Sequence, residues 1–244
     1  MRLNFFFNDT FKTALHELRD LFFPRSCVVC GRFLETHERD LCADCMDELP
    51  LTYQWDIVQN AAFERMVRRC EVEAAASLFF FLEKSAVRNI VYAVKYGGQQ
   101  QLGRRMGRLL GQQLAGSRAF RDCQAVVPVP LHPLRHWKRG YNQAEAIARG
   151  VAAALDLPVE TALIRRSRHT KTQTRLRGAA KSRNVQDAFR IDMRRAAQLQ
   201  ADGIRHLLLV DDVLTTGSTL AACIRPLNGA GFKASAATLA FAGS

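Results

Sequence analysis

The sequence is poor in acidic residues and in long apolar runs, and each shortage narrows the classes of protein to consider. Asp and Glu number 23 against 35 Lys and Arg, and the formal net charge is +12 at pH 7. This excess favours a polyanionic partner such as nucleic acid, although a basic surface can also serve solubility alone. No run approaches the roughly 18 apolar residues that a transmembrane helix needs, so none is expected.

A signal peptide is not expected either. Residues 5–7 are Phe-Phe-Phe, but Asn8 and Asp9 follow at once, so the apolar stretch is too short for a signal-peptide core. We therefore expect a cytoplasmic protein, with the inner face of the membrane as a further place of action.

Cysteine is present seven times, but a disulfide framework is not expected because the cytoplasm keeps thiols reduced. Four of the cysteines form two pairs, Cys27-x-x-Cys30 and Cys42-x-x-Cys45. Two such knuckles complete the tetrahedral shell of four thiolates that structural zinc prefers. A redox-active pair and an iron–sulfur cluster are the alternatives, and a redox site would need only one pair. The spacing favours structural zinc.

A length of 244 residues with 48% hydrophobic residues suits one α/β domain and a small appendage. Strands are expected at about 72–81, 125–130, 204–210 and 234–241. Helices are expected at about 10–23, 44–49, 86–94, 102–114, 143–154 and 220–229. From residue 125 onward strands and helices alternate, which predicts a mainly parallel sheet flanked by helices. We expect an N-terminal helix with the cysteine module over 1–60 and the α/β domain over 61–244.

The segment 207–219 carries the clearest functional pattern. Residues 207–210 are apolar without alternation, which suits a parallel strand buried on both faces. Asp211 and Asp212 should then lie at the strand's carboxyl end, where open α/β sheets bind ligands. The loop that follows, at the start of an expected helix, consists of Thr215, Thr216, Gly217, Ser218 and Thr219. Its amides and hydroxyls suit an anion the size of a phosphate, and the ligand should also offer hydroxyls or a divalent metal to the carboxylates.

This segment resembles the phosphoribosyl-diphosphate (PRPP) motif of the type I phosphoribosyltransferases. The resemblance implies that residues 215–219 hold the 5-phosphate of PRPP and that Asp211 and Asp212 take the ribose hydroxyls close to Mg²⁺. The same two aspartates are the candidates for catalytic residues. An ordinary strand followed by a Ser/Thr helix cap is the alternative, and it would explain one or two hydroxyls but not the acidic pair.

Two basic loops are expected at the same edge of the sheet. In the first, Arg135, Lys138 and Arg139 could neutralise a diphosphate or a DNA backbone. Trp137 and Tyr141 in that loop could stack on a base or a sugar ring. A solvated loop with one core Trp is the alternative.

The second basic loop covers residues 165–183 and has no acidic residue. Its eight positive charges are Arg165, Arg166, Arg168, Lys171, Arg175, Arg177, Lys181 and Arg183. Such a run repels itself unless a polyanion orders it, and a solvated basic face is the alternative. We expect the charges at 175, 177, 181 and 183 to contact diphosphate or DNA.

Taken in order, several motifs resemble the ComF/GntX family over nearly the whole chain. They are Leu-Phe-Phe-Pro at 21–24 before the cysteine knuckles, Lys-Tyr-Gly-Gly at 95–98, Val-Pro-Val-Pro at 127–130 with Arg-Gly-Tyr-Asn-Gln at 139–143, Thr-Gln-Thr-Arg-Leu at 172–176, Arg-Asn-Val at 183–185, and the PRPP-like motif. The resemblance implies a phosphoribosyltransferase-like domain with a zinc module. It also implies a role in moving single-stranded DNA into the cytoplasm of competent bacteria during transformation. The implied partners are single-stranded DNA, PRPP, and a DNA-uptake helicase or other competence proteins.

Three functions fit these features. The protein could bind single-stranded DNA and PRPP without turnover, transfer a phosphoribosyl group to an unidentified nucleophile, or sense PRPP and regulate a partner. No glutaminase nucleophile is expected, because Cys27 belongs to a metal knuckle. Fold alone does not choose among the three.

Overall fold

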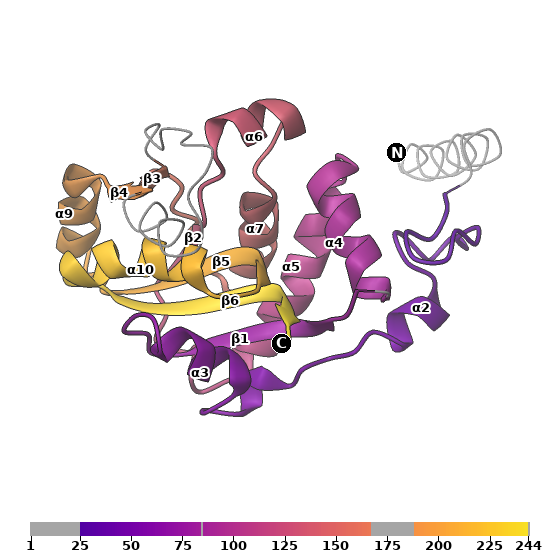
Figure 1. Cartoon of the computed structure of the whole chain (residues 1–244), viewed down its shortest axis with the longest axis horizontal. Coiled ribbons are helices and arrows are strands. Elements are labelled where there is room, and N and C mark those ends of the chain that lie inside the picture. The colour runs from indigo at the N-terminus through magenta and orange to yellow at the C-terminus, as the bar shows by residue number, and fades with distance from the viewer. Residues whose placement is uncertain (1–24, 84, 167–187, 244) are drawn as a thin grey trace, which may run out of the picture. The chain divides into compact units, whose positions relative to one another are not determined.

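The computed structural model describes residues 25–83, 85–166 and 188–243 (Figure 1). The chain divides into two compact units between Leu49 and Pro50, earlier in the sequence than the boundary expected at residue 60. Several expectations fall outside the described residues: the helix at 10–23, the side chain of Lys138, and Arg175, Arg177, Lys181 and Arg183. Within the described part of the chain, no helix is both long and apolar enough to cross a membrane.

The second unit is built on a parallel sheet of four strands in the order β1-β6-β5-β2 (Figure 1). The strands are β1 (Ala75–Phe81), β2 (Ala125–Pro128), β5 (His206–Leu214) and β6 (Lys233–Ala242). Residues 207–210 of β5 are fully buried, as their uninterrupted apolar run predicts for a central parallel strand. The expected parallel α/β architecture is confirmed.

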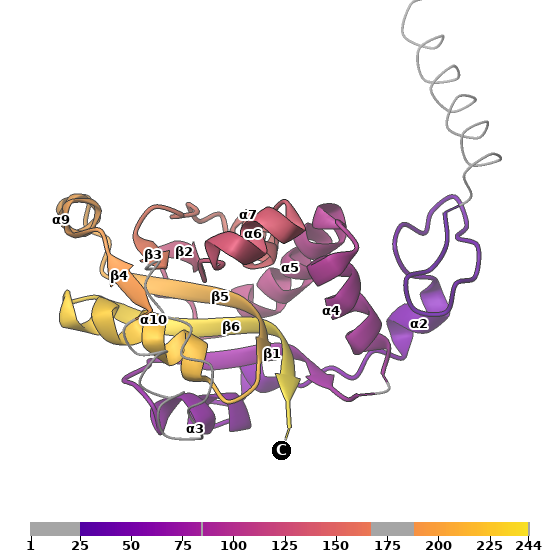
Figure 2. The same cartoon turned by 45° about the horizontal axis from the view of Figure 1, so that its top comes forward.

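Helices cover both faces of this sheet. On one side lie α4 (Ala86–Tyr96), α5 (Gln100–Ala115) and α7 (Gln143–Leu155), and on the other lies α10 (Ser218–Gly229) (Figures 1 and 2). The helix α3 (Ala61–Val67) packs against β1, and α9 (Met193–Ala201) precedes β5. The βα alternation therefore places loops from β2 and β5 at one edge of the sheet.

Glycines let α5 and α7 approach each other closely. A Cβ atom at Gly107 would overlap the backbone oxygen of Ile147, and one at Gly150 would overlap the backbone oxygen of Arg104. Such contact between backbones leaves no room for a methyl group on either helix. This packing fixes the position of α7, which begins beside the acidic pair.

Some elements carry too weak a periodicity to be predicted from the sequence. They are the 3₁₀ turn η1 (Gln54–Asp56), α3, α9, the short helix α6 (Pro133–Arg139), and the antiparallel pair β3 (Ile164–Arg166) and β4 (Phe189–Ile191). The first basic loop is thus partly helical. A proline at the first position of α6 suits a helix start, because its missing N–H would have no partner there.

Candidate functional site

The four predicted zinc ligands converge in the first unit. Their sulfur atoms all lie within 4.8 Å of one another, and Sγ of Cys30 lies 3.7 Å from Sγ of Cys42. A tetrahedral site with Zn–S bonds of about 2.3 Å separates its sulfur atoms by about 3.8 Å. Cys27, Cys42 and Cys45 are buried and Cys30 is exposed. The cluster has the ligand type, number and spacing of a structural zinc site.

Backbone amides prepare two of these thiols for a metal. Burial by itself would raise the pKa of Cys27, but hydrogen bonds from backbone amides, including that of Cys42 at 3.4 Å, lower it to about 6. The pKa of Cys42 is also lowered, first by the amide of Cys45. Burial and the neighbouring thiols raise the pKa of Cys45. Because four thiolates at this distance repel one another, a divalent cation is needed to hold all four ionised.

A buried carboxylate braces the loop between the two knuckles. Oε1 of Glu38 accepts hydrogen bonds from the amide of Ala43 at 2.7 Å and from Nη2 of Arg32 at 2.9 Å, and Oε2 accepts one from the amide of Glu35 at 2.9 Å. The amides of Glu35 and Ala43 lower the pKa of Glu38. The short helix α2 (Ala43–Asp47), close to the helix expected at 44–49, starts from this brace and carries Cys45.

At the carboxyl edge of the parallel sheet, Asp212 is held by two helices. Its Oδ1 lies 3.0 Å from Nζ of Lys95 near the end of α4, and its Oδ2 accepts a hydrogen bond of 2.9 Å from Nε2 of Gln143 at the start of α7. The carboxylate is 9% exposed. Oε1 of Gln143 is buried and has no hydrogen-bond partner among the described residues. These two contacts pair the Asp212 carboxylate with a cation and fix its orientation.

Asp211 is compensated much less. Its pKa is raised to about 7, first by burial and then by the charge of Asp212, against the opposing effects of the Asp212 amide, Lys95 and Arg166. Its Oδ1 accepts a hydrogen bond of 2.9 Å from the amide of Asp212. At neutral pH the carboxyl group is therefore balanced between its two protonation states. A ligand that brings hydroxyl donors or a cation would favour the carboxylate.

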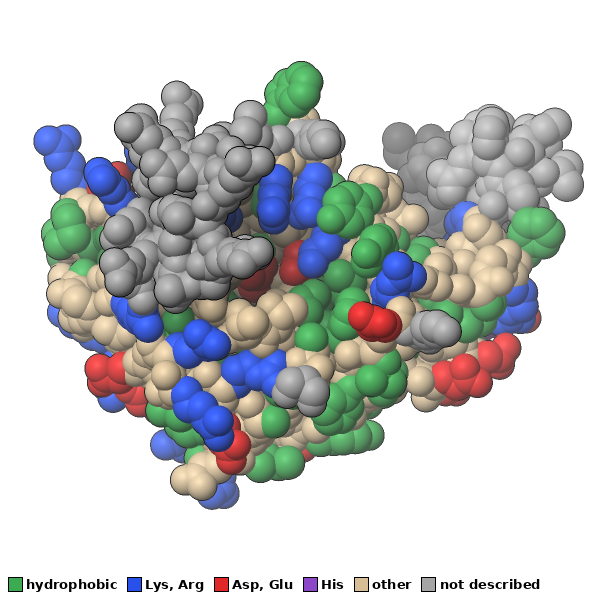
Figure 3. All heavy atoms as spheres, in the orientation of Figure 1, with side chains coloured by type: hydrophobic (Ala, Val, Ile, Leu, Met, Phe, Trp, Pro, Cys, Tyr) green, Lys and Arg blue, Asp and Glu red, His purple; other side chains and the backbone are tan. Residues whose placement is uncertain are grey.

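Basic side chains gather around the acidic pair. The pKa of Arg166, at the end of β3, is lowered first by burial and then by the charge of Arg135 in α6, and it is raised by Asp211. The pKa of His132 is lowered by burial and by both arginines. These side chains therefore lie close enough to interact. Figure 3 shows acidic surface recessed near the centre of this face, with basic side chains next to it.

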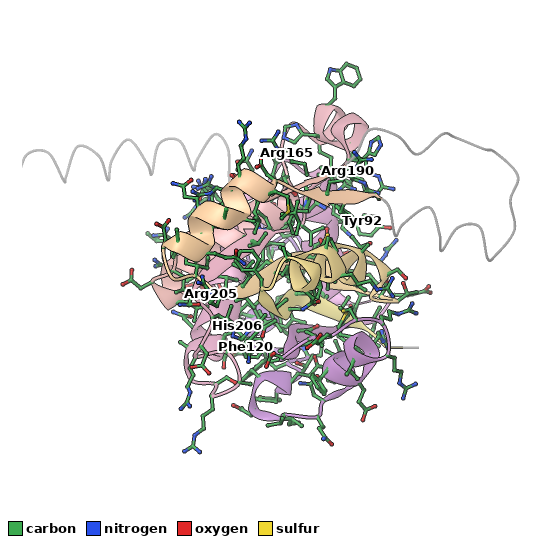
Figure 4. All side chains as sticks on the ribbon, turned by 90° about the vertical axis from the view of Figure 1, so that its left-hand side faces the viewer. Tyr92, Phe120, Arg165, Arg190, Arg205 and His206 are labelled. Carbon is green, nitrogen blue, oxygen red and sulfur yellow. The ribbon has the colours of Figure 1, made fainter. Side chains whose placement is uncertain are left out.

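The strand β3, at the start of the second basic loop, and the strand β4, which follows that loop, bring further positive charge together. Arg165 of β3 and Arg190 of β4 are partners in the antiparallel pair, and both are labelled in Figure 4. Arg165 is 72% exposed and its Nη2 lies 3.2 Å from Oδ2 of Asp192. Like charges directly opposite in a sheet repel one another, so an anion at this position would stabilise the pair.

The loop at 215–219, which the sequence analysis assigns to a phosphate-sized anion, passes through a left-handed glycine before α10 begins. Gly217 has a φ of 77° and caps α10, and a side chain there would come within 3.0 Å of Sδ of Met66. Thr215 and Thr216 are exposed. Oγ1 of Thr216 lies 3.0 Å from Oγ of Ser218. The exposed hydroxyls and the start of α10 together suit an anion.

One prediction at this edge was wrong in its detail. β5 does not end at the acidic pair but continues to Leu214, because β6 keeps pairing with it at Val213 and Leu214. Asp211 and Asp212 thus lie inside the last part of a strand. Their side chains alternate between its two faces.

Tyr141 does not offer the stacking face expected for it. The residue is 8% exposed, and its hydroxyl donates a hydrogen bond to the backbone oxygen of Val94. It packs the start of α7 against α4 and so helps to position the partners of Asp212. Trp137, by contrast, is 86% exposed on α6 and is available for stacking.

The sequence analysis missed an exposed aromatic pair on α4. The ring centroids of Tyr92 and Tyr96 lie 5.5 Å apart, with the guanidinium of Arg88 over the first ring at 4.7 Å and that of Arg139 over the second at 4.8 Å. Tyr92 is 48% exposed and Tyr96 is 65% exposed. Their spacing of four residues on a helix places them on one face, and this was the available signal.

The roles of Lys95 and Gln143 were also missed. Both residues belong to motifs that the resemblance had singled out, but the sequence does not indicate that their side chains meet at Asp212. That contact depends on how α4 and α7 pack on the sheet.

Mg²⁺, which the sequence predicts together with PRPP, prefers oxygen ligands such as these carboxylates. Both oxygens of Asp212 already have partners, and Oδ1 of Asp211 accepts the amide of Asp212. The remaining oxygen, Oδ2 of Asp211, accepts no hydrogen bond from the described residues. Of the oxygens of the pair, Oδ2 of Asp211 would therefore be the one to hold Mg²⁺.

Comparison with known proteins places this chain among named relatives. It is 27% identical over 218 residues to Competence protein F of Haemophilus influenzae, which covers 82% of this chain and 89% of that protein. It is 28% identical over 203 residues to DNA utilization protein YhgH of Escherichia coli K12, which covers 80% of each chain. The resemblance to the ComF/GntX family is confirmed. In a shorter stretch of 135 residues, the identity to DNA utilization protein YhgH of Salmonella typhimurium is 34%, over 54% of this chain and 56% of that one.

Two further comparisons each cover part of the chain. The family described as Double zinc ribbon domain matches residues 18–55, a range that contains the four clustered cysteines. Structural zinc is thus supported by both the family match and the geometry. Among solved structures, one titled as the allosteric regulatory enzyme of purine biosynthesis matches 61% of this chain and 30% of that chain, at 16% identity and a TM-score of 0.39.

Proposed function

We propose that this protein acts in the uptake or use of DNA and that it binds single-stranded DNA and PRPP at the carboxyl edge of its sheet. Homology to proteins named Competence protein F and DNA utilization protein, over about four fifths of the chain, supports the role in DNA uptake. The net charge of +12 supports a polyanionic partner.

The observation that carries the proposal is the convergence of three kinds of group. Asp211 and Asp212 suit ribose hydroxyls, and residues 215–219 on the same segment suit the 5-phosphate. Arg166 and Arg135 lie close to the acidic pair and suit a diphosphate. A structural helix cap would not require a carboxyl group at Asp211 whose pKa is raised to about 7.

Each group has a distinct task when PRPP is bound. Lys95 and Gln143 hold Asp212 in place, while Asp211 becomes ionised as it accepts hydrogen bonds from the ribose. Mg²⁺, when bound, would neutralise diphosphate charge beside Asp211. Gly217 takes the positive φ with which the loop enters α10, where a side chain would meet Met66 and Arg69, and the loop would present its exposed hydroxyls to the phosphate.

Single-stranded DNA would bind at the same edge of the sheet and would contact more of its surface than PRPP does. Trp137 and the pair Tyr92 and Tyr96 offer aromatic surface to bases of any identity. Arg165 and Arg190 offer charge to the backbone phosphates. Binding of this kind should be sequence-tolerant and sensitive to salt.

Two other functions of the same site remain as alternatives. A phosphoribosyl transfer to an unidentified nucleophile would release diphosphate from PRPP. A PRPP-sensing role would change a protein contact without release of diphosphate. A diphosphate assay during incubation with PRPP separates turnover from both forms of simple binding.

The test is titration of the full chain with PRPP, with and without Mg²⁺, and with a dT oligomer, each ligand also in the presence of the other. Native protein should bind both. Gly217→Val should abolish PRPP binding, Thr216→Ala should weaken it without strain at the loop, and Asp212→Asn should reduce the metal dependence more than the phosphate contact. Asp202→Asn, an exposed carboxylate on another part of the unit, is the matched control.

Either part of the proposal can fail by itself. An absence of heat on titration with millimolar PRPP at several salt concentrations would refute the PRPP site. An unchanged anisotropy of labelled dT oligomer at low salt would refute the DNA role.

A further inference from the structure

A second concentration of positive charge lies beside the phosphate-sized loop, apart from the cations around the acidic pair. It lines a pocket of about 680 Å³ between α3 and the end of the loop. The residues that matter here are Arg65, Arg68, Arg69, Glu64, Thr215 and Thr216. Figure 3 shows basic side chains gathered over this part of the face, near α3 and α10. Neither Asp211 nor Asp212 lines the pocket.

Arg65 is fixed in the wall of this pocket. Its Nη1 donates a hydrogen bond of 2.6 Å to the backbone oxygen of Thr215 and another to that of Ala242. Its guanidinium lies 4.1 Å from the centre of the Phe241 ring. The pKa of Arg65 is lowered by burial and by the charge of Arg69, so the two side chains lie close to each other. The position of Arg65 is thus set by the backbone of the loop and of β6.

The other two arginines are exposed and poorly compensated. Arg68 is 79% exposed and its Nη2 lies 4.0 Å from Oε2 of Glu64, which is 60% exposed. Among the described residues, no carboxylate lies within ion-pair distance of Arg65 or Arg69. Three guanidinium groups therefore share one distant carboxylate. Like charges held together in a hollow focus the positive potential there, and an anion relieves their repulsion.

We propose that the arginines of this pocket bind a phosphate group of an oligonucleotide backbone, beside the phosphate that residues 215–219 bind. The inference rests on the proposed function. The pocket offers guanidinium groups and shares the exposed residues Thr215 and Thr216 with the phosphate-binding loop, but its described lining has no acidic pair for ribose hydroxyls. Such a site recognises phosphate without sugar or base, as contacts to a nucleic-acid backbone do. The exposure of Arg68 and Arg69 suits a strand that passes along the surface.

The experiment measures the affinity of the full chain for a dT oligomer as a function of salt. The double variant Arg68→Ala with Arg69→Ala removes two exposed side chains and leaves the backbone contacts of Arg65 intact. Its affinity at low salt should fall about tenfold, and the slope of log K against log salt should flatten by about 0.7 to 1.4, from about 0.7 per phosphate on single strands. Glu64→Gln should raise the affinity severalfold, since Glu64 is the only acid in the described lining of the pocket.

The matched control is Arg104→Ala with Arg108→Ala. These two exposed arginines lie on α5, on the face of the sheet opposite α10. The control removes the same charge from a helix and should leave both the affinity and the slope unchanged. An equal loss in the control would mean that net charge alone sets the binding, and the pocket would have no special role.

Titration with PRPP distinguishes the source of the phosphate. The double variant should bind PRPP with the affinity of the Arg104 and Arg108 control. A loss of PRPP affinity as large as the loss for DNA would overturn the assignment to a nucleic-acid backbone. If native protein binds no dT oligomer, both this proposal and the DNA part of the proposed function fail. If native protein binds the oligomer and the double variant matches the control, this proposal alone fails.

Discussion

The cysteine cluster and the acidic pair both gather groups that repel one another when ionised, yet their compensation differs. The four sulfur atoms lie within 4.8 Å of one another, and a single cation satisfies all of them. At the sheet edge, Lys95 and Gln143 contact Asp212, whereas no cation among the described residues forms an ion pair with Asp211, whose pKa is raised to about 7. The first arrangement is completed by one resident metal and serves folding. The second leaves the charge of Asp211 only partly compensated, as expected of a group that the proposed ligand would contact.

The strongest test of this difference is removal of zinc. A chelator, or Cys42→Ser, should unfold residues 25–49, because structural zinc contributes on the order of 10 kcal/mol to modules of this kind. The β5 strand and α10 should keep their structure, since their core does not use the metal. Hydrogen exchange read by mass spectrometry should therefore rise over 25–49 and stay low over 206–229.

Cys70→Ala is the control, because Cys70 lies outside the cluster. It should leave the zinc content at one per chain and the exchange over 25–49 unchanged. Zinc-free native protein with full protection over 25–49 would show that the thiols hold this unit together without a metal.

The next test breaks the compensation of Asp212. Lys95→Met leaves a carboxylate that is 9% exposed without its cation, and we expect a loss of about 2 to 4 kcal/mol in the free energy of unfolding. Adding Asp212→Asn should recover much of that loss, because the unpaired charge is gone. Denaturant unfolding of the two single variants and the double variant measures the coupling. Additive losses would mean that the two side chains do not interact.

Removing the carboxyl group of Asp211 should stabilise the folded protein at high pH, whereas removing the cation of Asp212 destabilises it. Because its pKa is raised, the folded state binds the proton more tightly than the unfolded chain does, so the group's contribution falls as pH rises from about 4 to about 7. Asp211→Asn removes the ionisable group and with it this loss of stability at high pH. It should stabilise the protein at pH 8 by about 1 to 3 kcal/mol, have little effect near pH 4, and abolish PRPP binding. Thermal unfolding at the two pH values checks this, and stabilisation that is equal at both would contradict the raised pKa.

The contrast between the two sites also explains how far the sequence could predict them. The cysteine pairs and the strand at 207–210 follow from local spacing and from an uninterrupted apolar run, and both are confirmed. The end of β5 was wrong because it depends on the length of β6 beside it. Tyr141 was wrong because its partner, the backbone oxygen of Val94, lies on another helix. The cysteine pairs and the apolar strand can be predicted from residues that are close in the sequence. The partners of Asp212 and Tyr141 cannot, because the packing of α4 and α7 brings them together.

The smallest expected effect concerns the contribution of Trp137 to DNA binding. Trp137 is 86% exposed on α6, so its replacement should not change the free energy of unfolding. If its ring stacks on a base, Trp137→Ala should cost about 1 kcal/mol of binding to a dT oligomer, near the lower end for such stacking, and leave the salt slope unchanged because no charge is removed. Tyr141→Phe is the matched aromatic control and should bind DNA as native protein does, since that ring is buried. Fluorescence anisotropy at several salt concentrations measures both quantities. If the Trp137 variant binds the dT oligomer with native affinity, Trp137 does not stack on DNA and is an ordinary surface residue.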